Sequence, residues 1–158
     1  MIDKYEFQDL FDLDEVQHLT DAISMALEVG IVIVSPDGLP ITKPSNFCDF
    51  CKNLIRKTEI GSKNCEYSDS ILGRKSDKPV VSRCLSAGLV DAGVSIVING
   101  KHLASWMIGQ VILEGEEMSE LEQRERAKLL GIEEESFKES LKKVPRKSKE
   151  QFERILEM

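Results

Sequence analysis

The spacing of apolar residues changes twice within the first third of the chain. Between positions 16 and 27 apolar side chains recur every three or four residues, which is typical of an amphipathic helix. Asp12 or Asp14 can cap its start, and Gly30 suits the left-handed residue that often follows a helix end. The β-branched run at 31–34, the turn SPDG and the return LPIT then predict a β-hairpin.

Helical spacing returns after the breaker sequence TKPSN, and two helices are expected there. The first covers 47–57 and places Cys48, Cys51 and Ile55 near one face. The second covers 59–73. On this second helix four residues share a face at i, i+3, i+4 and i+7 spacing: Cys65, Ser68, Asp69 and Leu72.

Three strand-like segments follow, KPVVSRCL, GVSIVING and KHLASWMIGQVIL. The dipeptide Asn99-Gly100 between the last two predicts a type I′ hairpin turn, because both central residues of that turn need positive φ. Alternation of apolar and polar residues over 94–98 and 103–112 is loose, so part of this sheet should be buried on both faces.

The last third has helical patterns with clear start signals. SELE at 119–122 and SKEQ at 148–151 are capping boxes, Gly131 is a plausible helix stop, and a short helix should end before Pro145. Antiparallel strand pairs with helices packed on them make an α+β domain. The chain ends inside the helical pattern that begins at 148, as expected of a domain cut from a longer protein.

Composition and charge narrow the function classes. The 158 residues are 41% hydrophobic and 31% charged, which is typical of a globular protein, and the formal net charge is -7. An acidic chain is a poor nucleic-acid binder, since phosphate recognition needs a basic surface. The N-terminus is not a secretory signal and the longest apolar runs are strand-sized, so a membrane partner is not expected and the cytoplasm is the expected compartment.

The four cysteines lie close together in the sequence, at C-x2-C-x13-C-x18-C spacing: Cys48, Cys51, Cys65 and Cys84. Four thiolates are enough for zinc or for an iron–sulfur cluster, but a zinc ribbon normally supplies two CxxC pairs and this chain has one. Buried free cysteines also behave as small hydrophobic residues. Metal site, redox pair, pocket lining and plain packing all remain open at this point.

Other candidate residues are few. His18 and His102 are the only histidines and neither neighbours a cysteine in sequence, and no GxGxxG loop is present. Asp69 and Asp91 stand in mostly uncharged surroundings, and Trp106 lies in an apolar strand, where it suits either the core or a cavity wall. No acid–base or nucleophile constellation is apparent, so an enzyme is the least favoured class.

Two runs, FCDFCKNLIRKTEIGSKNCEYSD and CLSAGLVDAGVSIVINGKHLASWMIGQV, closely resemble the PocR sensory domain, and the tail from 131 resembles the segment that follows them. The resemblance implies a PAS-like fold, a central antiparallel sheet with flanking N- and C-terminal helices. It also implies a non-enzymatic input domain of prokaryotic signalling proteins, which binds small hydrocarbon derivatives, diols among them. Residues 1–158 would then be one sensory domain, with helix 148–158 leading to an output domain.

Carried over by the resemblance, three cysteines, two carboxylates and the final GQ of the second run take family positions: Cys51, Cys65, Cys84, Asp69, Asp91, Gly109 and Gln110. The chain departs from the family pattern at three places. Cys48 is outside the three-cysteine pattern, CLSAGL replaces the commoner CHAGL, and Val90 stands where a relative often has Trp. These departures touch the expected pocket wall, so the ligand cannot be inherited from the family.

The function predicted from the sequence is a sensory input domain for a small, largely apolar molecule such as an alcohol or diol. The pocket is expected between the sheet and the helices carrying Cys51 and Cys65, with ligand-binding residues Cys51, Cys65, Asp69, Cys84, Ser86, Asp91, Trp106 and Gln110. The signal would pass to a downstream histidine kinase or another output domain, and a homodimer through the last helix is plausible. The alternative is a zinc, iron–sulfur or redox sensor built on Cys48, Cys51, Cys65 and Cys84, and a scaffold module with a dry core is a third class.

Overall fold

The computed structural model describes residues 4–158 as helices on both sides of one sheet. The helical elements are α1 (Phe7–Leu10), α2 (Leu13–Leu27), the π-helix η1 (Phe50–Ile55), α3 (Glu59–Leu72), α4 (Glu120–Leu130), α5 (Glu134–Leu141) and α6 (Lys149–Leu156). The strands are β1 (Gly30–Val34), β2 (Val80–Arg83), β3 (Val90–Ile98), β4 (Lys101–Leu113) and β5 (Arg146–Lys147). Within the described residues no helix has the length and apolar character needed to span a membrane.

The sheet has the strand order β1-β4-β3-β2, and neighbouring strands in this series are antiparallel. The two-residue strand β5 pairs in parallel with the end of β4. The predicted α+β class and the PAS-like arrangement of a central antiparallel sheet with flanking helices are confirmed. The burial of β1 throughout and of β4 from Met107 to Leu113 confirms that part of the sheet is covered on both faces.

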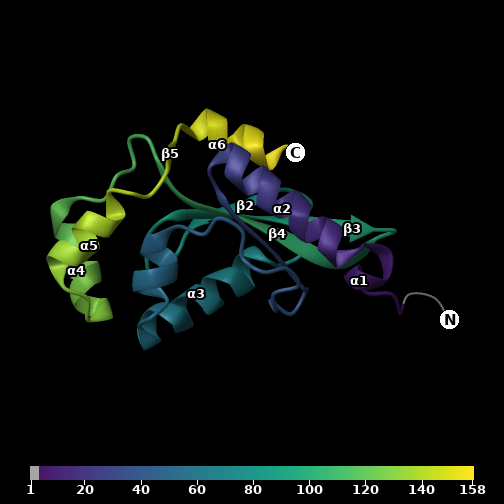
Figure 1. Ribbon diagram of the computed structural model, residues 1–158, viewed down its shortest axis with the longest axis horizontal. Coiled ribbons are helices and arrows are strands. Elements are labelled where there is room, and N and C mark those ends of the chain that lie inside the picture. Colours follow the sequence, from purple (N-terminus) through teal and green to yellow (C-terminus); the bar gives the residue numbers. More distant parts are fainter. Residues whose placement is uncertain (1–3) are drawn as a thin grey trace.

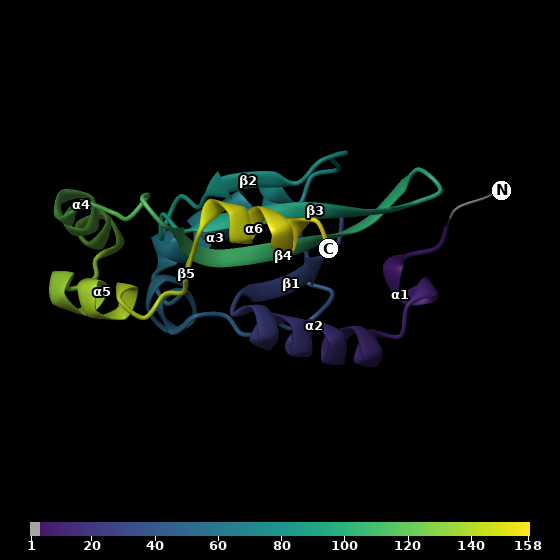
Figure 2. The ribbon, with the colours of Figure 1, turned by 90° about the horizontal axis from the view of Figure 1, so that it is seen from above.

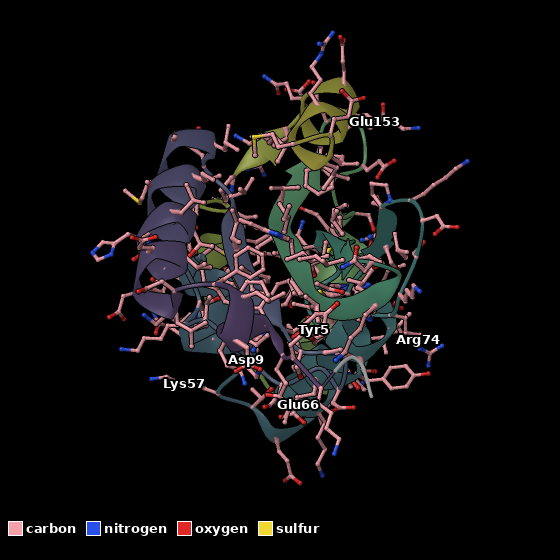
Figure 3. All side chains as sticks on the ribbon, turned by 90° about the vertical axis from the view of Figure 1, so that its right-hand side faces the viewer. Tyr5, Asp9, Lys57, Glu66, Arg74 and Glu153 are labelled. Carbon is pink, nitrogen blue, oxygen red and sulfur yellow. The ribbon has the colours of Figure 1, made fainter. Side chains whose placement is uncertain are left out.

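Helices α2 and α6 cover one face of the sheet, and α3 covers the other (Figure 1). Figure 3 shows the layers end-on, with Glu153 of α6 and Glu66 of α3 at opposite sides of the molecule. Helices α4 and α5 lie together at one end of the sheet (Figure 2). The α3 layer packs tightly because Gly93 of β3 has no side chain, and a Cβ there would overlap the carbonyl of Leu72.

Local signals placed most element boundaries correctly. Asn99 and Gly100 both have positive φ, 51° and 79°, and they form the predicted turn between β3 and β4. Ser148 makes a complete capping box, and Gly131 ends α4 at φ 70°. Ser119 caps α4, but the reciprocal half of its box is missing because the Glu122 carboxylate instead pairs with two arginines.

Three local predictions were wrong in detail. Helix α2 ends with Glu28 in the left-handed conformation at φ 54°, while Gly30 is already in β1. The return LPIT is not a continuous strand: it meets β1 at an isolated bridge between Val34 and Pro40 and at Ile33, whose carbonyl accepts the N–H groups of Ile41 and Thr42. The helix expected over 47–57 is the shorter, wider η1, in which the Arg56 N–H donates to the carbonyl of Cys51 at 2.9 Å.

Candidate functional site

A small cavity of about 30 Å³ lies where η1 and α3 meet the middle of the sheet. Six of the eight predicted ligand-binding residues line it: Cys51, Cys65, Asp69, Cys84, Asp91 and Gln110. Ser86 lies beside the cavity, since its hydroxyl is 3.1 Å from the sulfur of Cys65. Trp106 is not part of this group, because it packs on the opposite face of the sheet with residues of α2 and α6.

A β-bulge in β4 brings Gln110 to the cavity. Val90 pairs with Val111 and Asp91 pairs with Gly109, so Gln110 has no partner in the ladder. Its φ of 60° is unusual for a residue other than glycine. The bulge resets the alternation of faces: Gln110 lines the cavity, while Val111 packs among the α6 residues on the other side.

Gln110 links three elements through two hydrogen bonds. Its backbone N–H donates to Asp91 Oδ1 at 2.8 Å, and its side-chain Oε1 accepts the Cys48 N–H at 2.7 Å. The second bond joins β4 to the segment that enters η1. A movement of this segment therefore reaches the central strand directly.

Gly109 makes room for the Asp91 carboxylate. In the ladder it lies between Gly30 of β1 and Asp91 of β3, and a Cβ at Gly109 would overlap Asp91 Oδ1. Burial raises the pKa of Asp91 to about 7, and the carboxylate of Asp69 adds to that effect. The Gln110 N–H and Arg56 oppose the shift without cancelling it. Asp91 is thus an acid that holds or releases its proton near neutral pH.

Arg56 is the charged cavity residue that the sequence analysis missed. Its Nη2 lies 3.3 Å from Asp69 Oδ2, and its guanidinium lies over the Phe47 ring at 5.3 Å from the centroid. Its Nε atom is buried and has no hydrogen-bond partner. Burial also raises the pKa of Asp69 even beside this guanidinium. A basic residue in a run of charged ones is usually solvent-exposed, so no local signal identified it.

The cysteines differ in reactivity according to their burial. Burial raises the pKa of Cys65, and it raises the pKa of Cys84 to about 12. The Cys51 thiol donates to the Cys48 sulfur, which lowers the pKa of Cys48 and raises that of Cys51. At neutral pH the cavity therefore holds protonated thiols, and Cys48 beside it is the one with the most thiolate character.

All four cysteines are free. Among residues 4–158 no group of three or more His, Cys, Asp or Glu side chains is placed so that it can hold a metal ion. The histidines lie elsewhere: the His18 ring hydrogen-bonds the carbonyl of Asp14 on α2, and the His102 ring hydrogen-bonds Ser105. What the cavity offers is weakly acidic thiols, one acid that titrates near neutral pH, and a guanidinium with an unused donor.

Comparison with known proteins gives one family. A family model described as "Sensory domain found in PocR" matches residues 9–158. No curated protein and no solved structure matches the chain.

Proposed function

The chain belongs to the PocR sensory-domain family, and on that premise we propose that it is a non-enzymatic input domain that binds a small, largely apolar molecule in the cavity between η1, α3 and the sheet. The observation that carries the proposal is the gathering of six predicted residues, from four helices and strands and one loop, around one small cavity. Apolar walls with a few converging polar groups are typical of small-molecule sites. An alcohol or diol is the ligand class that the resemblance favours.

The size of the cavity restricts how a ligand enters. About 30 Å³ has room for roughly two water molecules, since a water needs about 10–15 Å³ measured in this way. Phe47 lines this cavity and also a neighbouring groove of about 580 Å³ that Asn46 and Cys48 border. Displacement of Phe47 would join the two spaces, so a molecule with several carbon atoms must push this ring aside.

The segment 46–50, which contains Phe47, also offers a route for the signal. Cys48 is tied to Gln110, and Phe50 of η1 packs edge-on against Phe137 of α5 with ring centroids 5.0 Å apart. After α5 the chain pairs with β4 through β5, and Ser148 then caps the start of α6. A ligand that favours one position of 46–50 would bias these contacts, which is the requirement for a population shift. The receiver would be an output domain in the same chain, a histidine kinase among others, and a homodimer and a cytoplasmic location fit this role.

A thermal-shift screen with small alcohols, diols, amines and acids tests the proposal. A ligand at about 100 times its Kd should raise the Tm by about 5 °C or more. Cys65→Met, which fills the cavity, should remove this shift, whereas Trp106→Phe on the opposite face should keep it. No stabilisation by any compound, or equal stabilisation of the Cys65→Met protein, would refute the proposal.

A second candidate, a thiol redox sensor, is favoured by the hydrogen-bonded pair Cys48 and Cys51. With hydrogen peroxide, the Cys48 thiolate would attack one oxygen and release hydroxide, giving a sulfenic acid. The Cys51 thiol would then displace that oxygen as water and close a disulfide. Mass spectrometry should show the loss of two hydrogen atoms in wild type and in Cys65→Ser but not in Cys48→Ser. Disulfide formation through Cys65 or Cys84 instead would exclude this pair.

A further inference from the structure

We propose that Arg56 is the specificity-determining residue of this cavity, and that its Nε–H donates a hydrogen bond to a neutral oxygen of the ligand. The assignment rests on the proposed ligand-binding function. It adds a residue that sequence patterns did not indicate and a chemical requirement: the ligand carries a hydroxyl, ether or carbonyl oxygen as acceptor and no net charge.

The first argument is the unused donor. Buried polar atoms in proteins nearly always have a hydrogen-bond partner, and a buried donor of a charged group is costly to leave without one. Among the described residues just one other buried side-chain nitrogen or oxygen, the Tyr5 hydroxyl, shares this state with Arg56 Nε. Because Arg56 lines the cavity, we expect an acceptor bound there to complete the hydrogen bonding of its Nε–H.

The second argument is how the rest of the guanidinium is held. One edge faces Asp69 at 3.3 Å and one face covers the Phe47 ring at 5.3 Å from the centroid. The backbone of Arg56 is fixed at the end of η1 by the hydrogen bond to Cys51. The planar group is therefore oriented before a ligand arrives, which reduces the cost of binding. The same Phe47 ring borders the neighbouring groove, so ligand entry and Arg56 orientation are coupled.

The third argument is the balance of charge. One guanidinium stands among two carboxyl groups, Asp69 and Asp91, and the cavity thiols are protonated. A carboxylate ligand would add a third acidic group, and an ammonium ligand would place a cation against Arg56. A neutral oxygen compound avoids both and leaves the Arg56–Asp69 pair intact.

The assignment is tested by isothermal titration of the whole domain with three compounds that each have a three-carbon chain: 1-propanol, propionate and propylammonium. Wild type should bind 1-propanol more tightly than either ion. Arg56→Lys keeps the charge but removes the guanidinium fork, and it should weaken 1-propanol binding about tenfold or more. Arg124→Lys is the matched control, because Arg124 is an exposed arginine paired with Glu134, and it should bind as wild type does.

A second measurement, by NMR, uses the wild-type protein and therefore does not depend on whether the Arg56→Lys variant folds. In a ¹H–¹⁵N spectrum of arginine side chains, the Arg56 Nε–H signal should shift on addition of 1-propanol, whereas the Arg124 signal should not. Suppose that wild type binds 1-propanol, that Arg56→Lys binds it with the same Kd, and that the Arg56 Nε–H signal does not shift. These results would overturn the assignment of Arg56 and leave the proposed function standing. Tighter binding of propionate or propylammonium would overturn it as well. Binding of no compound by wild type would overturn the proposed function together with it.

Discussion

The two faces of the sheet are made from the same strands but have opposite chemistry. On the α3 face, a cavity of about 30 Å³ contains Arg56, Asp69, Asp91 and three thiols. On the α2 and α6 face, an apolar groove of about 520 Å³ runs beside Trp106, and none of its lining residues is charged. Trp106 and Met107 are neighbours in sequence, yet they pack into these two different layers.

This contrast indicates that the α2 and α6 face contributes mainly to stability, whereas the α3 face is shaped for binding. Burial of apolar side chains from α6, such as Phe152 and Leu156, stabilises one layer without regard to pH. The other layer keeps carboxyl groups away from water at a cost in folding free energy, and it leaves a donor of Arg56 without a partner. Such costs are typical of sites shaped for a ligand rather than for stability.

The largest expected effect concerns the apolar face. Phe152→Ala removes a buried ring of α6 from the layer that holds this helix on the sheet, and it should lower the free energy of unfolding by about 3–5 kcal/mol. The loss should be equal at pH 5 and pH 8, because the apolar cluster around Phe152 contains no titrating side chain. Urea denaturation at both pH values measures it. A loss confined to one pH would show that the two faces are not energetically separate.

On the α3 face, a substitution at Asp91 should raise the free energy of unfolding, and the gain should depend on pH. An acid whose pKa is higher in the folded than in the unfolded state binds more protons when folded, so Asp91 lowers stability as pH rises from about 4 to about 7. Asp91→Asn keeps an oxygen to accept the Gln110 N–H and cannot ionise. The difference in unfolding free energy between Asp91→Asn and wild type should therefore grow by up to roughly 4 kcal/mol between pH 4 and pH 8.

Urea denaturation of both proteins across this pH range measures that growth. Exposed Asp37→Asn is the matched control and should show a small, constant difference from wild type. A pH-independent difference for Asp91→Asn would mean that Asp91 is solvated like an ordinary surface carboxylate.

A smaller effect is expected at the bulge that joins the two faces. Gln110→Ala removes the acceptor of the Cys48 N–H and should cost about 1–3 kcal/mol of unfolding free energy. Hydrogen exchange at the Cys48 amide should accelerate in this variant. Gln123→Ala, which removes a hydrogen bond to the carbonyl of Met118, is the comparison away from the site and should leave Cys48 exchange unchanged. Unchanged exchange in Gln110→Ala would remove the proposed link between β4 and η1.

The sequence predicted what local chemistry determines. Asp12, Ser148 and the Asn99-Gly100 turn act through neighbours a few residues away, and each is where the pattern placed it. The bulge at Gln110 depends on pairing with β3, nineteen positions back at Asp91, and no local pattern encodes it. The π-helical winding of η1 was likewise not visible in the spacing of Cys48, Cys51 and Ile55.

The candidate site also combines features that the sequence indicates with features that only tertiary contacts create. Residue type and family resemblance indicated the six residues that meet at the cavity, although the sequence alone could not show that they meet. Trp106 was grouped with them because a lone Trp in an apolar strand near Gly109 and Gln110 suits a cavity wall, but in the folded chain it packs on the other face. Arg56 was missed because its partial burial results from the contacts with Phe47 and Asp69, which only the folded chain creates.

The central claim, that ligand binds on the α3 face, is tested most directly by backbone ¹H–¹⁵N chemical-shift mapping with the best compound from the thermal-shift screen. The account predicts the largest shifts at 47–56, 65–69, 84, 91 and 109–110, with the Trp106 indole N–H little changed. Largest shifts at Trp106, 19–23 and 155–158 would place the ligand in the apolar groove and contradict the account.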